Sequence, residues 1–451
     1  MPTDPVPGLL SRATELLERE FAALPAWQPA AIDDRAEDIL AEVAHRLGNN
    51  FPYFHPLYAG QMLKPPHPLA RAAYALAMSI NPNNHARDGG RASSEMEIEA
   101  VRQLAGMFGW TEYLGHLSSS GTLANLEALW VAGQLAPKSR IVGSAQAHYT
   151  HQRISAVLWL DYATVAADER GRMDLTALEA ELSKGDVGTV VATLGTTAIG
   201  AVDPLEAMVA LRERYGFRLH VDAAYGGYFK LIAESLDEPA RRAYGVIQQA
   251  DSIVIDPHKH GLQPYGCGCV LFRDPGVGRF YKHDSPYTYF TSHELHLGEI
   301  SLECSRAGAA AVALWATHKL LPPVPGGEFA RGLADGRAAA LELDRRLRAD
   351  ARFQPLPGGP ELDIVAWRVK ADTPEKSSRL AHQVFDICAA HDLHLALVQL
   401  PLSWFAPVAQ SANSDAQVTC LRSVLMKPEH KTWLDEIWQR ISAACAEVSL
   451  Y

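Results

Sequence analysis

Lys259 is the residue whose position is hardest to explain without chemistry. It follows the short apolar run Ser252–Ile255 and stands between His258 and His260. Burying an ammonium group is costly unless its pKa falls, and a desolvated neutral amine is the nucleophile that Schiff-base formation requires. The alternative is an ordinary lysine that faces solvent at the end of a strand. The two histidines could pair on a metal, but no third ligand stands at motif spacing, so we expect no metal site.

A second segment with chemical potential is the loop that leads into a helical stretch at Gly121–Leu135. Ser120, Gly121 and Thr122 offer hydroxyl donors, a backbone without a Cβ and the free N–H groups of a helix start. Together these features favour an anion such as a phosphate group. The same residues also fit an ordinary Ser/Thr helix cap, and the Gly-x-x-x-x-Gly-Lys pattern of a nucleotide-binding P-loop is absent.

A third feature is Asp222, which ends an apolar run that begins at Leu219 and is followed by small residues. Ligands of open α/β sheets bind at the carboxyl ends of the strands, although a turn or helix cap would also explain this carboxylate. In chain order the sequence therefore offers an anion cradle, a strand-end carboxylate and a lysine. Pyridoxal phosphate needs this set: a phosphate site, a carboxylate that keeps its ring nitrogen protonated, and a lysine for its aldehyde.

The elements that must position these residues alternate along the middle of the chain. Short apolar runs, which we interpret as strands, are separated by helical stretches, as expected for βαβ units in a mostly parallel sheet with helices on both faces. The runs are Ile141–Gly143, Ala156–Leu160, Thr164–Ala166, Val190–Leu194, Leu219–Ala223, Ser252–Ile255 and Cys269–Phe272. Ser94 and Glu97 match a capping box that would start a helix running to about Phe108.

The two ends of the chain differ from this middle part. The sequence opens with two amphipathic helical stretches, which a proline-rich connector at 51–68 follows. The last third alternates long helical stretches with fewer strands and predicts a second, smaller α+β domain. We therefore divide the chain into a helical arm, a large cofactor-binding domain and a small domain, at 1–65, 66–322 and 323–451.

Composition excludes several classes of protein. The 451 residues carry a formal net charge of −11, and no basic run is longer than a pair, which argues against a nucleic-acid partner or an anionic membrane surface. The six cysteines form no Cys-x-x-Cys, so we expect reduced thiols in a cytoplasmic protein. Met1–Leu10 lacks the features of a secretory signal, and the longest nearly apolar run, Ala307–Ala316, is too short to span a membrane.

The chain resembles the pyridoxal-phosphate-dependent group II amino-acid decarboxylases, the family of the aromatic-amino-acid, histidine and glutamate decarboxylases. The similarity spans about residues 50–426, and four blocks in the family's order carry it: Gln146–His148, Ala192–Thr197, His220–Tyr225 and Asp256–Lys259. The resemblance implies the α/β architecture of fold-type-I, PLP-dependent transferase-like proteins. It also implies a decarboxylase that converts an L-amino acid into an amine and carbon dioxide, and a homodimer with its active site at the interface.

The resemblance implies roles for individual residues. Lys259 matches the Schiff-base lysine, Asp222 the partner of the pyridine nitrogen, and His148 the histidine that stacks on the ring. Further matches are Ala224 against the same ring, Ser120, Gly121 and Thr122 at the phosphate, Thr196 with a hydroxyl near the cofactor, His258 beside the lysine, and Arg422 near the substrate carboxylate. An exposed strand arginine is the alternative for Arg422.

The stretch 282–299, rich in His, Ser, Thr and Tyr, lies where the family has a mobile catalytic loop. The resemblance implies that a tyrosine of this loop protonates the substrate Cα after carbon dioxide leaves. Tyr287, directly after Pro286, is the preferred match and Tyr289 the second. Relatives that form aldehydes lack this donor, so the tyrosine favours amine formation. A pair of packing aromatics is the alternative.

Two positions depart from the family pattern. His260 stands where aromatic decarboxylases have tryptophan and glutamate decarboxylases methionine, and Asp256 stands where many relatives have asparagine near the phosphate. A carboxylate beside a phosphate would be repelled, so we expect Asp256 to turn away or to cap a turn. The substrate side chain stays open, as do three alternatives: a carbon–carbon lyase, an aldehyde-forming oxidative decarboxylase and a non-catalytic relative.

Overall fold

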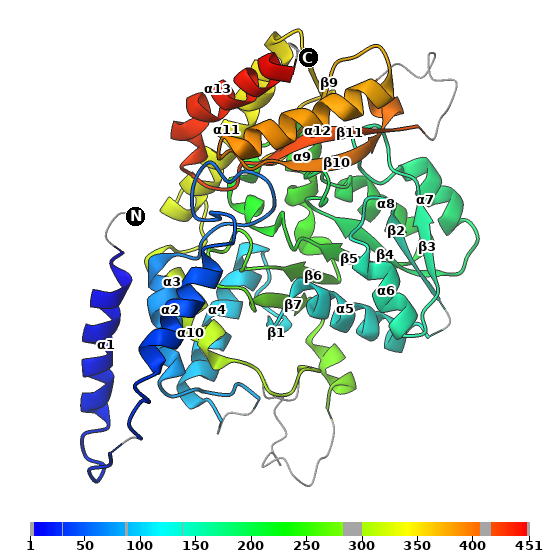
Figure 1. Ribbon diagram of the computed structural model, residues 1–451. Helices are drawn as coiled ribbons and strands as arrows, with labels where there is room; N and C mark the ends of the chain where they lie inside the picture. The colour runs from blue at the N-terminus through cyan, green and yellow to red at the C-terminus, as the bar shows by residue number, and fades with distance from the viewer. Residues whose placement is uncertain are drawn as a thin grey trace.

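The computed structural model describes residues 4–28, 30–85, 89–137, 139–282, 300–405 and 416–448. Its centre is a seven-stranded sheet with the strand order β1-β7-β6-β5-β4-β2-β3 (Figure 1). Strands β2 to β6 run parallel, whereas β7 is antiparallel to both of its neighbours. The mostly parallel sheet is therefore confirmed. The strands are β1 Leu114–Ser118, β2 Arg140–Ser144, β3 Tyr162–Val165, β4 Val187–Thr193, β5 Arg218–Asp222, β6 Ser252–Ile255 and β7 Gly268–Phe272.

Both faces of this sheet are buried, as β6 shows. Successive side chains of a strand point to opposite faces, and Val254 packs in a cluster with α5, whereas Ile253 and Ile255 belong to the larger core that includes α8. All three side chains are fully buried. The helices around the sheet are α3 Pro68–Met78, α4 Arg91–Met107, α5 Gly121–Leu135, α6 Thr150–Val157, α7 Leu175–Leu182, α8 Leu205–Tyr215, α9 Glu238–Gly245 and α10 Gly308–Leu320.

The prediction of a strand at Ala156–Leu160 is wrong. Helix α6 covers the start of this run, and the rest is turn. Val157 and Trp159 are 68% and 95% exposed, so the run is apolar without being buried. Periodicity alone cannot distinguish such a short run from the end of a helix.

The predicted capping box is also wrong. Ser94 lies inside α4, whose N-cap is Gly90. The carboxylate of Glu97 turns to other elements instead: Oε1 accepts a hydrogen bond from the Leu117 backbone N–H at 2.9 Å and pairs with Arg306 at 2.5 Å. Glu97 therefore forms a tertiary ion pair with Arg306 and does not form the helix cap that the local sequence pattern predicts.

A smaller antiparallel sheet with helices forms the C-terminal part of the chain, as predicted. Its strand order is β10-β11-β9-β8. Helices pack on one face of this sheet, and the opposite face contacts Ile199 and Ala201 in the turn after β4. The small domain therefore supports a loop of the large one. Its elements are α11 Glu328–Ala349, β8 Phe353–Pro355, β9 Ile364–Val369, α12 Pro374–Ala390, β10 Ala396–Pro401, β11 Gln417–Val424 and α13 His430–Val448.

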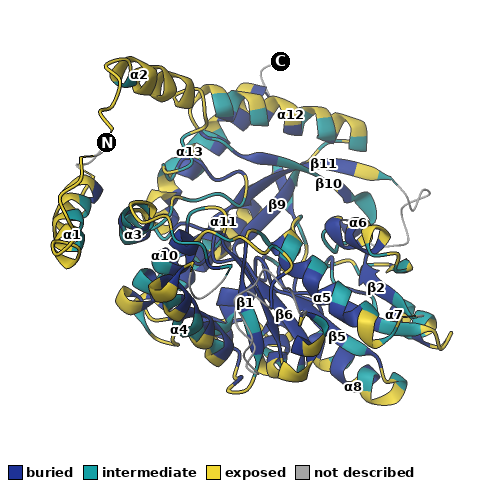
Figure 2. Cartoon of the chain, turned by 90° about the horizontal axis from the view of Figure 1, so that it is seen from below, coloured by how far each residue is buried: buried dark blue, intermediate teal, exposed yellow. Residues whose placement is uncertain are grey.

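The N-terminal arm consists of α1 Val6–Glu20 and α2 Ala36–Leu47. Figure 2 shows both helices at the margin of the molecule and largely exposed. α1 contacts α3, whereas no residue of α2 is buried. Among the described helices, none combines the length and the hydropathy needed to cross a membrane. The division at 65 and 322 stays a prediction.

Candidate active site

The predicted cradle, carboxylate and lysine meet at the carboxyl ends of the parallel strands. Asp222 ends β5, and Lys259 follows β6 in a turn. A cavity of about 200 Å³ lies between these strand ends and the start of α5. Its wall consists of Ser120, Gly121, Thr122, Asn125, His148, Thr150, Thr193, Gly195, Thr197, Asp222, Ala224, Tyr225, Asp256, His258 and Lys259. One cavity thus contains nearly all of the residues that the sequence singles out.

Asp222 is held in place by three hydrogen bonds. Its Oδ2 contacts His151 Nε2 at 2.8 Å and accepts from Asn125 Nδ2 at 3.2 Å, and its Oδ1 accepts from the Ala224 N–H at 3.1 Å. Burial alone would raise the pKa of this carboxyl, but the His151 bond and the charge of Lys259 outweigh burial and hold its pKa well below the usual range. Asp222 is therefore an oriented carboxylate at neutral pH.

A buried polar chain continues behind Asp222. Asn125 Oδ1 lies 2.8 Å from His220 Nε2, and His220 Nδ1 lies 2.9 Å from Ser252 Oγ. Burial lowers the pKa of His220 to about 3, so this ring is neutral. The sequence analysis missed Asn125, His151 and His220 as site residues. For Asn125 and His220 the spacing was a usable signal, because Asn125 is one turn after Gly121 and His220 shares a strand face with Asp222.

The start of α5 has the features of an anion cradle. Ser120 is the N-cap, and its Oγ accepts from the Leu123 N–H at 3.2 Å. A Cβ built on Gly121 would lie 2.5 Å from Asp256 Oδ2, so the turn after β6 approaches this backbone more closely than any other residue type permits. Backbone N–H groups and the positive end of the helix dipole face the cavity here.

Lys259 reaches the cavity beside Asp256. Its Nζ lies 3.1 Å from Asp256 Oδ2, and His258 Nε2 lies 3.5 Å from the same oxygen. The Asp256 carboxylate therefore does not turn away from the cradle, contrary to our expectation. The sequence could not show this, because the contact depends on how closely the turn after β6 approaches α5.

His148 lies in the same wall. Its Nδ1 is 2.7 Å from Thr150 Oγ1, and its ring packs 4.5 Å from that of Tyr149. Burial lowers the pKa of His148, so a neutral ring faces the cavity. Ala224 also lines the wall. Their contacts with a cofactor ring stay predictions.

Two predicted residues lie outside the cavity wall. The Thr196 hydroxyl accepts from the Ala201 N–H at 3.0 Å and so holds the turn after β4, whereas Thr193 and Thr197 present their side of that turn to the cavity. Arg422 is buried and donates to the carbonyl oxygens of Thr197 at 2.7 Å and Ala198 at 2.8 Å. It also donates to Gly60 O and Gln61 Oε1. Tyr287 and Tyr289 lie outside the described residues.

His258 and His260 face different surroundings. The His258 ring stacks near Tyr265, whereas His260 lies between the rings of Tyr225 and Phe229 with its Nε2 3.3 Å from Asp363 Oδ2. Within the described ranges, no group of three His, Cys, Asp or Glu side chains could hold a metal ion.

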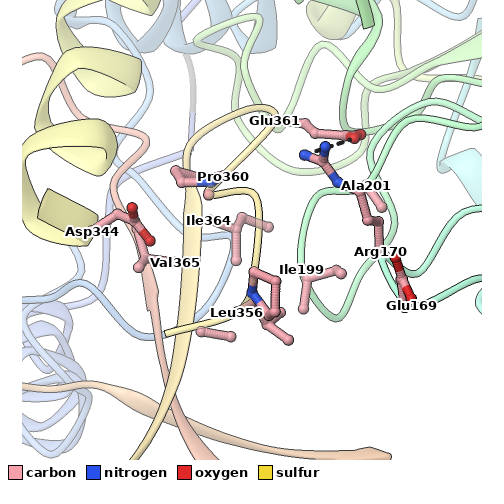
Figure 3. Close-up of a pocket in the computed structure, with 13 residues that line it drawn as sticks. Glu169, Arg170, Ile199, Ala201, Asp344, Leu356, Pro360, Glu361, Ile364 and Val365 are labelled. Atoms are coloured by element: carbon pink, nitrogen blue, oxygen red, sulfur yellow. Dashed lines mark ion pairs between the residues drawn. The ribbon is translucent and has the colours of Figure 1, made fainter. Parts of the chain in front are cut away.

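Another depression lies at the seam between the turn after β4 and the small domain (Figure 3). Ile199, Ala201 and Ile364 line it, and Arg170 pairs with Glu361 at its edge at 3.5 Å. Its volume is about 20 Å³, which is room for roughly one water molecule. This depression is therefore too small for a substrate.

Comparisons with known proteins agree with this geometry. The family model described as the pyridoxal-dependent decarboxylase conserved domain matches residues 123–370. The L-tyrosine decarboxylase of Enterococcus faecium is 29% identical over 392 residues, which cover 65% of this chain and 64% of that protein. A probable L-tyrosine/L-aspartate decarboxylase of Methanothermobacter thermautotrophicus is 30% identical over 322 residues, covering 70% of this chain and 84% of that protein.

Among solved structures, Oryza sativa TDC with PLP and tryptamine is similar in fold. The two chains superpose with a TM-score of 0.80 at 18% sequence identity, and the match covers 99% of each. The chain spans less than two thirds of the Enterococcus relative. The likeness therefore establishes the fold of nearly the whole chain, while the sequence match rests on its central part.

Proposed function

The chain belongs to the pyridoxal-dependent decarboxylase family, and on that premise we propose that it removes the α-carboxylate of an L-amino acid to give an amine and carbon dioxide. The observation that carries this proposal is the single cavity shared by Lys259, Asp222 and the start of α5. An amine-release screen over the common amino acids tests it. The names of the relatives make tyrosine and aspartate the first substrates to try.

The residues of the cavity fit pyridoxal phosphate. The backbone at Gly121 and Thr122 and the dipole of α5 suit a phosphate group, and the ionised Asp222 can hold a proton at a ring nitrogen. Lys259 supplies the amine that the aldehyde requires. When bound, the cofactor supplies an electron-accepting ring for the pair of electrons that the departing carboxylate leaves behind.

The hydrogen bonds around Asp222 define its part in the reaction. His151 and Asn125 fix one carboxylate oxygen, and the Ala224 N–H fixes the other. A carboxylate held in this way cannot rotate away from the proton that it stabilises, so its charge stays directed into the cavity. His148 and Ala224 bound the space in which a planar ring would lie.

Protonation of the substrate Cα requires a donor, and we assign it to Tyr287, with Tyr289 as the second candidate. Product ratios of Tyr287→Phe and Tyr289→Phe distinguish them, because the donor's loss shifts the product from amine to aldehyde. Amine at the parental rate from both variants would refute the assignment. The same comparison separates a decarboxylase from an aldehyde-forming enzyme.

We assign the substrate carboxylate to Arg422. Four of its five N–H groups bond to oxygens of the described residues. Within that part of the chain the fifth, on Nη2, has no acceptor, and Nη2 lies beside the carbonyl of Thr197, a residue of the cavity wall. Arg422→Lys cannot reproduce the planar fork. We therefore expect a higher KM with a smaller change in kcat.

We propose a homodimer with its active site at the interface, and the exposed arm supports the association of two chains. Ile39, Val43 and Leu47 recur every fourth residue along α2 and form an apolar stripe, and all three are exposed in the single chain. An amphipathic helix with no buried residue gains its stability by packing elsewhere. A second copy of the chain, held in the same way by its own arm, would cover the stripe.

A reducing compartment such as the cytoplasm fits the cysteines. All six are free thiols, and five of them are buried. Free buried thiols without disulfide partners are typical of proteins that stay in a reducing environment.

A further inference from the structure

Asp256 is a buried carboxylate that faces the start of α5. Its side chain is 3% exposed, and its Oδ2 lies 3.1 Å from Lys259 Nζ. Its Oδ1 is buried without a hydrogen-bond donor from the described part of the chain. A Cβ on Gly121 would meet both carboxylate oxygens, at 2.5 and 2.7 Å. The carboxylate therefore occupies the edge of the space in which an anion at this helix start would lie.

Most of the titratable groups around Asp256 are neutral near pH 7. Burial lowers the pKa of His148 and of His258, so both rings are neutral near pH 7. Burial raises the pKa of the neighbouring phenols and thiols, which stay protonated; these are Tyr228, Tyr265, Cys267 and Cys269. Asp256 and Lys259 are the two oppositely charged side chains in contact here, and the carboxylate of Asp222 in the same cavity also interacts with Lys259.

In the proposed function, on which this inference rests, the cofactor phosphate lies at the start of α5. We propose that Asp256 serves as the counter-charge of Lys259 before loading and opposes the phosphate, so that cofactor binding takes up a proton. A phosphate monoester loses its second proton near pH 6. Two anions side by side in a buried site titrate as a coupled pair that retains one proton. Asp256 therefore sets how tightly, and at which pH, the cofactor is held.

The test measures the dissociation constant of pyridoxal phosphate from the loaded full-length protein by equilibrium dialysis, from about pH 6 to about pH 8.5, on either side of the phosphate pKa. Asp256→Asn keeps the shape of the side chain and removes its charge. We expect the constant of the parent protein to rise with pH. The variant should show a flatter pH dependence and bind about ten-fold tighter at the alkaline end, the factor that one pKa unit represents.

Pyridoxal, which lacks the phosphate, is the second probe. Its dissociation constant should change much less between parent and variant, because the contact of Asp256 with Lys259 is common to both probes and only pyridoxal phosphate brings a second anion to Asp256. An equal gain for pyridoxal, or the same pH dependence in both proteins, overturns the proposal. Asp256→Ala also removes the charge but introduces no amide group. Its dissociation constants for both probes should follow those of Asp256→Asn.

A matched control removes a carboxylate outside the cavity. Asp344 in α11 is largely buried and pairs with Arg348, and Asp344→Asn should leave the dissociation constant unchanged at every pH. A parent protein that retains no pyridoxal phosphate would refute the proposed function itself. Retention that is insensitive to Asp256 would refute only the present inference.

Discussion

At the scale of single residues, we expect turnover to depend most strongly on the charge of Asp222. Its pKa stays low because hydrogen bonds and the nearby Lys259 outweigh the cost of burial. Asp222→Ala removes the charge that stabilises a proton on the cofactor ring, so we expect turnover to fall by about 10²-fold or more. The lysine is untouched, and the cofactor should stay attached.

Two measurements check this prediction together. Amine release reports turnover, and the visible absorbance of the purified variant reports cofactor retention. Near-parental turnover would show that Asp222 is not the carboxylate that the reaction needs. Loss of both signals would assign the residue to cofactor binding alone.

Residue types predicted part of this site. Lys259, Asp222 and Gly121 are each compatible with an ordinary loop or cap, and they point to a cofactor site because they occur together, in chain order, at the ends of predicted strands. Asn125 and His220 lie inside regular elements, where their residue types do not stand out and only their spacing from Gly121 and Asp222 could have identified them. The direction of the Asp256 side chain follows from the approach of two elements distant in sequence, which residue types do not encode.

At the scale of elements, the start of α5 depends on a glycine. Gly121→Ala places a Cβ 2.5 Å from Asp256 Oδ2, at the edge of the space in which the phosphate would lie, so the backbone of the helix start must shift away from that space. We expect cofactor affinity to fall by about ten-fold, or roughly 1.4 kcal/mol, with little change in the melting temperature.

Gly106→Ala is the matched control. Gly106 lies in α4, and a Cβ there meets nothing within 4 Å. The substitution should stabilise the helix by about 0.5–1 kcal/mol and leave cofactor affinity unchanged. Equal affinities in both variants, measured by dialysis, would show that the close approach at Gly121 does not shape the cradle.

The junction between the connector and the small domain should respond to pH. Lys427 is buried, and its Nζ donates to the Tyr58 carbonyl at 2.6 Å. Burial and the charge of Lys64 lower its pKa to about 7. The unfolded chain binds this proton up to a pKa of about 10.4. Between these values the unfolded state holds more protons, so the contribution of Lys427 to stability rises with pH.

Lys427→Met isolates this contribution. The difference in melting temperature, variant minus parent, should fall steadily from about pH 7 to about pH 9.5, which lies between the folded and the unfolded pKa. A thermal denaturation series across this range measures it. A difference that does not vary with pH would mean that Lys427 keeps an ordinary pKa in the folded protein.

In the large domain, the presence of most strands and helices could be predicted from the sequence, but the residues at which they begin and end could not. Strands β4 and β6 are buried on both faces, and their sequences are mostly apolar, as expected for inner strands of a parallel sheet. In β5 only Leu219 and Val221 are apolar, and they alternate with Arg218, His220 and Asp222.

The strand predicted at Ala156–Leu160 is absent, because Val157 at the end of α6 and Trp159 in the turn after it are apolar but exposed. The start of α4 was predicted incorrectly, because Glu97 pairs with Arg306, a residue distant in sequence, and does not form the predicted cap.

At the scale of the whole molecule, the exposed stripe of α2 predicts self-association. Ile39→Asp with Val43→Asp places charges on that stripe and should lower the mass in light scattering from about twice to about once that of the 49.2 kDa chain. His45→Asp adds a charge to the same helix outside the stripe and should leave the dimer intact. A monomeric parent protein at assay concentration would contradict the proposed dimer.

The most direct test of the central claim is to locate the cofactor on the chain. Purified protein should be yellow, and borohydride reduction followed by peptide mapping should find the pyridoxyl label on Lys259, the lysine that enters the cavity beside Asp256 and opposite Asp222. A label on any other lysine, or no label at all, would contradict the account.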